Sequence, residues 1–259
     1  MRIDLTGRTA IITGSTKGIG LAAARGLADA GASVIVNGRT QEAVYAAVAS
    51  IGGDARGVVA DVGDARGCAA LIAGAPHADI LVNNVAFIGW GEFFDADDAI
   101  WQQAWEANVM AGVRLSRHYL PGMAAAGWGR VVFISSESAR NVQPDLVPYG
   151  STKLALHALS RGIAKRMRGT GVTSNVVVPG PTLSDGAEGM LAPMAAAAGT
   201  TVAEAGAQFV RDNRPSSLLG RMATVDEVAA MIVYVCAPQA SATTGAVLRV
   251  DGGVIEDVN

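Results

Sequence analysis

Short apolar runs alternate with longer alanine-rich segments along almost the whole chain, and this alternation constrains the fold more than any other feature. The runs are rich in β-branched residues and lack a strict polar–apolar alternation, as is typical of strands covered on both faces. The predicted strands are Thr9–Thr13, Ser33–Asn37, Arg56–Ala60, Ile80–Asn83, Arg130–Ser135, Thr173–Val178 and Ala246–Val250. The predicted helices are Gly18–Ala30, Gln41–Ile51, Asp64–Ala73, Ile100–Ala126, Val147–Arg168 and Val225–Cys236.

Strands that alternate with helices favour right-handed crossovers and a parallel sheet. The chain has 259 residues, of which 50% are hydrophobic, so it can fill a substantial core. It contains no low-complexity linker and no repeat beyond the strand–helix unit. We therefore expect a single α/β domain over residues 1–259, a doubly wound Rossmann-type fold around a seven-stranded parallel sheet.

One segment, residues 181–215, interrupts the alternation. It is rich in Ala, Gly and Thr and lies between the sixth predicted strand and the last predicted helix. Ligands bind at the carboxyl ends of strands in open α/β sheets, and long insertions there often act as lids. We expect a lid that is mobile without ligand, with a pair of surface helices that have no such role as the alternative.

Bulk properties exclude several partners. The net charge of −3 and an aromatic content of 5% argue against a nucleic-acid partner. The longest strongly apolar stretch, Val228–Ala237, is shorter than the roughly 20 residues of a spanning helix. The N-terminus has no apolar segment of signal-peptide length. We expect a soluble, cytoplasmic protein without a membrane or nucleic-acid partner.

The cysteines and histidines do not indicate a metal site. Cys68 and Cys236 lie in no CxxC or CxxH pattern, and His77, His118 and His157 lack metal-ligand spacing. We expect no metal and no disulfide, and structural roles for these side chains.

A glycine-rich turn, Thr13–Gly20, joins the first predicted strand to the first helix with the spacing GxxxGxG. Gly14 permits a tight turn, and Gly18 and Gly20 allow a pyrophosphate to approach closely. The helix N-terminus then offers free N–H groups and a favourable dipole to that anion. The turn therefore predicts a dinucleotide site.

A second motif, Tyr149-Gly150-Ser151-Thr152-Lys153, places a phenol and an ammonium one helical turn apart on the same face. A tyrosine with an ordinary pKa near 10 is a poor acid–base catalyst at neutral pH, and a nearby ammonium is expected to lower that pKa. Ser136, just past the end of a strand, is placed to hydrogen-bond a substrate oxygen. Together these residues indicate proton transfer to or from an alcohol or carbonyl.

With these motifs the sequence resembles the short-chain dehydrogenase/reductase family over nearly its whole length, including Asp251-Gly252-Gly253 near the C-terminus. The resemblance implies a catalytic tetrad of Asn108, Ser136, Tyr149 and Lys153. It implies cofactor contacts from Gly14, Ser15, Thr16, Lys17, Gly18, Ile19, Gly20, Arg39, Asp61, Val62, Asn83, Tyr149, Lys153, Pro179, Gly180 and Thr182.

The resemblance also implies the roles of the tetrad. Tyr149 is the general acid/base, Lys153 lowers its pKa and holds the nicotinamide ribose, and Ser136 positions the substrate oxygen. Asn108 supports a water that links Lys153 to solvent. Ala86 stands where the family's NNAG motif has glycine, and it adds about 1 kcal/mol of strain if that position needs a positive φ.

The second predicted strand ends without the carboxylate that normally binds the adenosine ribose and repels a 2′-phosphate. Gly38 occupies the acidic position, Arg39 follows it, and Lys17 lies in the glycine turn. Arginine suits bidentate phosphate binding. We expect NADP(H) to be preferred, with NAD(H) also usable.

The expected enzyme interconverts an alcohol and a ketone or aldehyde on a small or medium organic substrate. Two alternatives stay open: a carrier-protein-linked 3-oxoacyl reductase, and a catalytically silent nucleotide-sensing regulator. The stretch Ala124–Trp128 lacks the basic residues expected for a carrier protein, and the intact tetrad argues against a sensor.

By resemblance the protein is expected to be a homotetramer or homodimer that pairs through the helices at Ile100–Ala126 and Val147–Arg168. Small residues on these helices would allow close helix approach: Ala104, Ala107, Ala111, Ala155, Ala158 and Gly162.

Overall fold

The computed structural model describes residues 2–258, and its centre is a seven-stranded parallel sheet with the order β3-β2-β1-β4-β5-β6-β9. The strands are β1 (Thr9–Ile12), β2 (Ser33–Gly38), β3 (Arg56–Val59), β4 (Ile80–Asn83), β5 (Gly129–Ile134), β6 (Val172–Pro179) and β9 (Val247–Val250). All seven predicted strands are therefore confirmed, with small differences at their ends. The order reverses beside β1, so the carboxyl ends of β1 and β4 diverge at the point where such sheets bind ligands.

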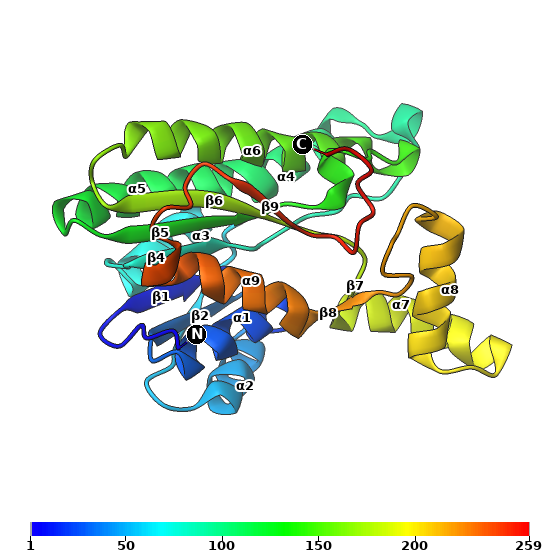
Figure 1. Cartoon of the computed structure of the whole chain (residues 1–259), viewed down its shortest axis with the longest axis horizontal. Helices are drawn as coiled ribbons and strands as arrows, with labels where there is room; N and C mark the ends of the chain where they lie inside the picture. The colour runs from blue at the N-terminus through cyan, green and yellow to red at the C-terminus, as the bar shows by residue number, and fades with distance from the viewer. Residues whose placement is uncertain (1, 259) are drawn as a thin grey trace.

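Helices cover both faces of the sheet (Figure 1). One face packs on α1 (Gly18–Asp29), α2 (Gln41–Ile51) and α9 (Val225–Cys236). The other packs on α3 (Ala65–Gly74), α5 (Ala111–Ala125) and α6 (Val147–Arg166). The two faces make two large apolar clusters, so the central strands are buried on both sides, as their unbroken apolar pattern predicts.

The long helix predicted over Ile100–Ala126 is interrupted. It consists of α4 (Asp98–Trp105), a π-helical stretch η2 (Glu106–Met110) and α5. Such π-bulges insert one extra residue into a helical turn and often occur at functional sites. Composition does not reveal this bulge, which contains the predicted site residue Asn108.

The segment 181–215 forms β7 (Thr182–Leu183), α7 (Asp185–Ala198) and α8 (Val202–Asn213), which project from one side of the molecule (Figure 1). β7 pairs with β8 (Ala223–Thr224), and α7 and α8 enclose a small apolar cluster of Leu191, Val210 and Met222. We call residues 185–213 the α7–α8 segment. The remaining elements are short 3₁₀ turns: η1 (Phe93–Asp95), η3 (Glu137–Ala139), η4 (Pro144–Leu146) and η5 (Pro238–Ala240).

The small residues expected to allow helix pairing between subunits differ in exposure. Ala104, Ala107 and Ala111 are buried within the chain itself, whereas Ala158 and Gly162 of α6 are exposed. The first three therefore pack inside the fold, and this part of the expectation was wrong. Within residues 2–258, no helix is long and apolar enough to cross a bilayer.

Candidate active site

The glycine-rich turn after β1 is held by hydrogen bonds to the end of β4. The Thr13 hydroxyl accepts hydrogen bonds from the backbone N–H groups of Asn84 (2.9 Å) and Val85 (3.1 Å). The side-chain amide of Asn84 donates in return to the carbonyl oxygens of Thr13 (3.0 Å) and Gly14 (3.1 Å). The two loops therefore form one continuous surface.

Two glycines of the turn meet strict geometric demands. Gly18 has φ +57°, in the left-handed region that disfavours other residues. At Gly20 a Cβ would lie 2.5 Å from the carbonyl oxygen of Gly14 and 2.6 Å from Nδ2 of Asn84. The N-cap residue of α1, Lys17, makes no side-chain capping bond, so other groups must satisfy the first N–H groups of this helix.

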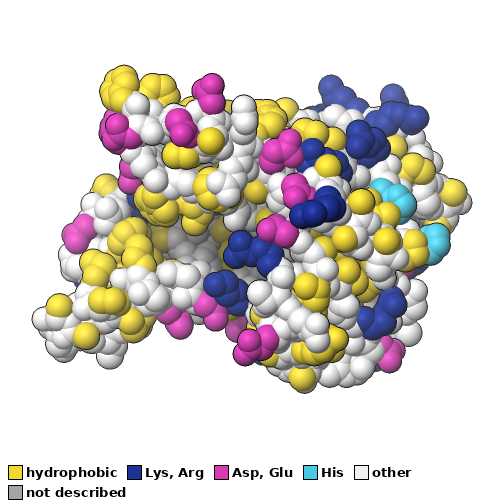
Figure 2. Space-filling model, turned by 180° about the vertical axis from the view of Figure 1, so that it is seen from behind, with side chains coloured by type: hydrophobic (Ala, Val, Ile, Leu, Met, Phe, Trp, Pro, Cys, Tyr) yellow, Lys and Arg dark blue, Asp and Glu magenta, His cyan; other side chains and the backbone are white. Residues whose placement is uncertain are grey.

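A cavity of about 420 Å³ opens beside the turn, at the carboxyl ends of β1 to β4. Figure 2 shows the molecule hollowed between the α7–α8 segment and the rest of the chain, with apolar side chains around the hollow and basic side chains at one edge. Six predicted cofactor contacts line the cavity: Gly14, Thr16, Lys17, Arg39, Asp61 and Val62.

The other predicted contacts lie behind or beyond this cavity. Ser15 is fully buried, and its hydroxyl donates to the carbonyl oxygen of Ile12 (2.7 Å) and accepts from the N–H of Asn37 (3.0 Å). It therefore supports the turn from below. Ile19 and Gly20 lie in the first turn of α1, while the Pro179, Gly180 and Thr182 stretch follows the end of β6.

Asn83 is buried, yet neither polar atom of its side chain has a hydrogen-bond partner among the described residues. A buried amide without partners is costly, and this one lies beside Gly112 of α5, outside the lining of the cavity. The close-packed glycine turn and the basic side chains of Lys17 and Arg39 at the cavity fit a dinucleotide.

Ala86 does not carry the strain that its place in the NNAG-like motif suggested. No non-glycine residue within residues 2–258 has a positive φ, so the loop accepts alanine without the left-handed conformation. The backbone strain of about 1 kcal/mol that a positive φ at Ala86 would bring is therefore absent.

The predicted tetrad lies together at the end of β5. Ser136 follows β5, Tyr149 lies in the first turn of α6, and Lys153 is one turn further on the same face. The Lys153 Nζ is 5.4 Å from the centre of the Tyr149 ring and donates to the carbonyl oxygen of Ile134 (2.8 Å). Lys153 is 2% exposed, so its ammonium is almost completely removed from solvent.

Burial sets the acidity of this pair. It raises the pKa of Tyr149 to about 12, an effect that Ser136 opposes through a hydrogen bond and Glu137 adds to through its negative charge. Burial also lowers the pKa of Lys153 to about 7. The lowered tyrosine pKa expected from the nearby lysine is therefore not found in this structure: desolvation is the largest cause of the shift, and Lys153, whose Nζ donates to the carbonyl oxygen of Ile134, is not among the groups that lower this pKa.

Asn108 reaches the site from the π-helical stretch. Its side-chain amide donates to the carbonyl oxygen of Phe87 (2.9 Å) and to the hydroxyl of Thr152 (2.9 Å), and its oxygen accepts from the N–H of Phe87 (2.6 Å). Asn108 therefore ties the loop after β4 to α6 beside Lys153. The bulge turns this side chain inward.

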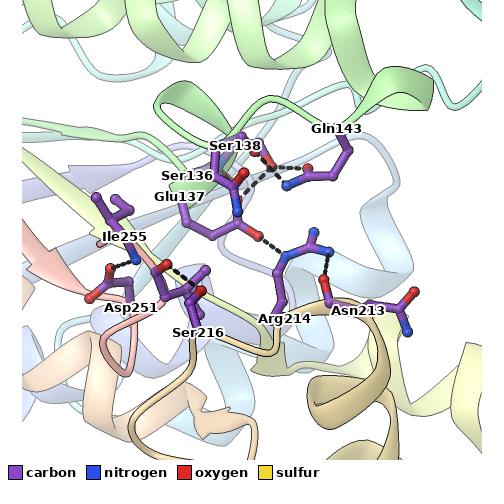
Figure 3. A network of polar contacts seen from close by, with 12 residues as sticks. Ser136, Glu137, Ser138, Gln143, Asn213, Arg214, Ser216, Asp251 and Ile255 are labelled. Atoms are coloured by element: carbon purple, nitrogen blue, oxygen red, sulfur yellow. Dashed lines mark hydrogen bonds and ion pairs between the residues drawn. The ribbon is translucent and has the colours of Figure 1, made fainter. Parts of the chain in front are cut away.

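A network of polar contacts next to Ser136 has no counterpart in the sequence predictions (Figure 3). Glu137 has a side chain that is 5% exposed, and its Oε1 lies 2.7 Å from Nε of Arg214, the residue directly after α8. The hydroxyl of Ser138 lies 2.9 Å from both Glu137 Oε2 and Gln143 Oε1. A carboxylate directly after a strand-end serine is a signal that sequence reasoning can use, but its partner 77 residues away gives none.

Comparison with known proteins supports the same class of enzyme. A family model described as enoyl-(acyl carrier protein) reductase matches residues 14–255. The uncharacterized oxidoreductase YvaG of Bacillus subtilis (strain 168) is 40% identical, and the alignment covers 100% of both chains.

Solved structures agree with that result. A short chain dehydrogenase/reductase family protein is 36% identical with a TM-score of 0.85 and covers 98% of each chain. The L-sorbose reductase of Gluconobacter frateurii, complexed with NADPH and L-sorbose, is 30% identical with a TM-score of 0.92 over 100% of both chains. The chain therefore belongs to the short-chain dehydrogenase/reductase family and is an oxidoreductase that acts on CH–OH groups.

Proposed function

We propose that the protein is an NADP(H)-dependent oxidoreductase that interconverts an alcohol and a ketone or aldehyde on a small or medium organic substrate. The observation that supports this most directly is the grouping of Ser136, Tyr149 and Lys153 at the end of β5. A serine and a tyrosine hydroxyl that share one substrate oxygen can stabilise it and exchange its proton.

Each side chain has one task in this proposal. The nicotinamide, when bound, supplies or accepts the hydride. In the reducing direction Tyr149 donates its phenolic proton to the carbonyl oxygen, and Ser136 donates a hydrogen bond to that oxygen. Lys153 binds the nicotinamide ribose and favours the phenolate that remains. Asn108 holds the loop and helix around Lys153 and orders a water that connects it to solvent.

The cofactor contacts are proposed as predicted: Gly14, Ser15, Thr16, Lys17, Gly18, Ile19, Gly20, Arg39, Asp61, Val62, Asn83, Tyr149, Lys153, Pro179, Gly180 and Thr182. The preference for NADP(H) rests on Lys17 and Arg39, which are both exposed, line the same cavity and form no ion pair among the described residues. Two free cations around one point suit a 2′-phosphate. The NADPH in the sorbose reductase complex is consistent with this choice.

The test is NADPH oxidation, followed by absorbance, with a panel of ketoses, 2,3-diketones and 3-oxoacyl esters. We expect turnover with at least one carbonyl class, and Tyr149→Phe should lower kcat by at least about a thousandfold, at the upper part of the range for acid–base catalysis. NADPH affinity should stay within a few-fold, because the hydroxyl is needed for proton transfer and not for holding the nucleotide. Full activity in Tyr149→Phe would remove the assignment.

A carrier-linked 3-oxoacyl reductase is the second candidate, favoured by similarity to a solved structure described as a putative betaketoacyl-ACP reductase, which is 38% identical with a TM-score of 0.86. The α5–β5 connection, Ala124–Trp128, offers no basic residue for an acidic carrier protein. Equal turnover of a free 3-oxoacyl ester and its carrier-bound form would support the first candidate. A strong preference for the carrier-bound form would support the second.

Assembly as a homotetramer or homodimer, from the family resemblance, and a cytoplasmic location, from composition, stay predictions. So do the single cofactor-binding domain over residues 1–259 and the lid role of residues 181–215.

A further inference from the structure

Glu137 is an unusual residue for its position. It follows Ser136 directly in the sequence. Its carboxylate is buried and forms an ion pair with an arginine of the same chain. A buried carboxylate is stable only with strong partners. Its partners are the Arg214 guanidinium at 2.7 Å and the Ser138 hydroxyl at 2.9 Å.

Arg214 comes from another part of the molecule. It is the first residue after α8, its side chain is 11% exposed, and its Nη1 donates to the carbonyl oxygen of Asn213 (2.7 Å). Figure 3 shows the guanidinium reaching from the end of the α7–α8 segment to the loop that carries Ser136. Ser216, two residues later, donates to the carbonyl oxygen of Val254 (2.7 Å), so the stem of the segment is also fixed to the C-terminal loop.

The loop that holds Glu137 presses on the catalytic helix. A Cβ on Gly150, the residue after Tyr149, would lie 2.6 Å from the carbonyl oxygen of Ser138. The carboxylate therefore sits in a layer that touches the first turn of α6. The negative charge of Glu137 raises the pKa of Tyr149, and a positive charge next to that carboxylate acts in the opposite direction.

We propose that Arg214 is a positioning residue that docks the end of the α7–α8 segment on the catalytic loop and neutralises Glu137 beside Tyr149. Seating of the segment then also prepares the general acid/base. This inference rests on the proposed role of Tyr149. When the segment is displaced, the Glu137 carboxylate loses its counter-ion and opposes ionisation of the phenol.

Other charges near this pair are already engaged. The groups on the packed elements are Lys153 and His157 of α6, Arg140 of the loop, and Arg249, Asp251 and Asp257 of the C-terminal segment. Arg140 pairs with Asp257 (2.7 Å), and Arg249 lies 3.7 Å from Asp251. Lys153 donates to a backbone carbonyl. Arg214 is thus the cation that the described residues bring onto Glu137.

The experiment compares the pH dependence of alcohol oxidation in Arg214→Met, Glu137→Gln and the double variant. Loss of Arg214 should raise the apparent pKa in the pH profile of alcohol oxidation by about one unit, and Glu137→Gln should lower it. The double variant should return close to wild type, because both charges are then gone. Arg211→Met is the matched control: this arginine lies one turn earlier on α8, is exposed and bonds only to Gln208 among the described residues.

A second readout does not need turnover. The chain has four tyrosines, so the ultraviolet titration of wild type minus Tyr149→Phe, with saturating NADP⁺, isolates one phenol. The Arg214→Met curve should lie at higher pH than the wild-type curve. If the titration midpoint does not move in Arg214→Met and only kcat falls, Arg214 merely holds the segment in place and the proposal is overturned. A double variant whose pKa does not return toward the wild-type value would overturn it as well. Full activity in Tyr149→Phe would instead remove the proposed function itself.

Discussion

At the scale of single residues, desolvation governs the chemistry of this site. Burial raises the pKa of Tyr149 to about 12 and lowers that of Lys153 to about 7, so burial disfavours the charged form of each side chain. A working phenolate–ammonium pair needs help from charges around it. In the proposed function the substrate oxygen and the nicotinamide ribose would give that help, and pairing with Arg214 offsets the opposing charge of Glu137.

Cofactor choice is also decided by a few side chains. Arg39→Ala should lower kcat/KM for NADP(H) about ten- to hundredfold, the equivalent of one charge-assisted contact of roughly 1.5–3 kcal/mol. NAD(H) use should change little, because it lacks the 2′-phosphate. Equal kcat/KM values of the wild-type protein with NAD(H) and with NADP(H) would contradict the preference.

Conversion toward NAD(H) needs more than a carboxylate at Gly38. A Cβ there would lie 2.4 Å from Cγ2 of Thr16 and 3.1 Å from Cγ2 of Val44. Gly38→Asp alone forces Thr16 to move, so Thr16→Ser with Gly38→Asp, compared with Thr16→Ser alone, is the sharper test. We expect the pair of changes to raise the NAD(H)/NADP(H) ratio.

The predicted site residues whose place in the fold follows from the sequence share a local cause. The tetrad and the glycine turn depend on spacings within one helix or on positions directly after strands, and topology brings those ends together. Glu137–Arg214 and Gly18–Asp185 join residues 77 and 167 positions apart. No local pattern selects these partners from the other charged residues, so they had to be seen in the structure.

At the scale of elements, the first turn of α7 closes on the first turn of α1. Oδ2 of Asp185 accepts a hydrogen bond from the N–H of Gly18 at 2.7 Å, where α1 lacks a side-chain cap of its own. A carboxylate is stabilised at a helix N-terminus for the same reason as a phosphate. Asp185 therefore occupies part of the place proposed for the pyrophosphate, and the cofactor has to displace it.

We expect Asp185→Asn to bind NADPH about three- to tenfold more tightly, in line with about 0.7–1.4 kcal/mol for one competing charge. Glu188→Gln, in the same turn of α7, is the charge-matched control and should leave the affinity unchanged. Calorimetric titration measures both. Equal or weaker binding by Asp185→Asn would show that this contact does not compete with the cofactor.

The helix predicted as one piece over Ile100–Ala126 is interrupted for a reason that lies outside the helix itself. Its apolar period is helical throughout, and the sequence contains no glycine or proline at the break between α4 and α5. The π-helical stretch exists where Asn108 bonds to Phe87 and Thr152. Tertiary hydrogen bonds therefore decide the local geometry, and a single-sequence pattern does not contain them.

At the scale of the whole molecule, α6 couples the site to the stability of the fold. It carries Tyr149, Lys153 and His157 into the layer between the sheet and solvent. The hydroxyl of Ser135 donates to the carbonyl oxygen of Lys153 (3.0 Å), so it accepts from Nε2 of His157, which lies 2.9 Å away. Burial, helped by the charge of Arg140, lowers the pKa of His157 to about 4.

This shift predicts how stability depends on pH. The folded chain keeps His157 neutral down to about pH 4, whereas the unfolded chain binds a proton near its ordinary value of 6.5. The unfolded state therefore holds more protons between these values, so the free energy of unfolding falls as pH drops from 6.5 toward 4 and gains nothing from this group above 6.5. His157→Gln should weaken that fall, with a smaller difference in Tm between pH 7.5 and pH 5 than wild type. His77→Gln, at an exposed histidine, should keep the wild-type difference, and an equal loss of Tm in all three proteins would show that His157 does not control the acid response.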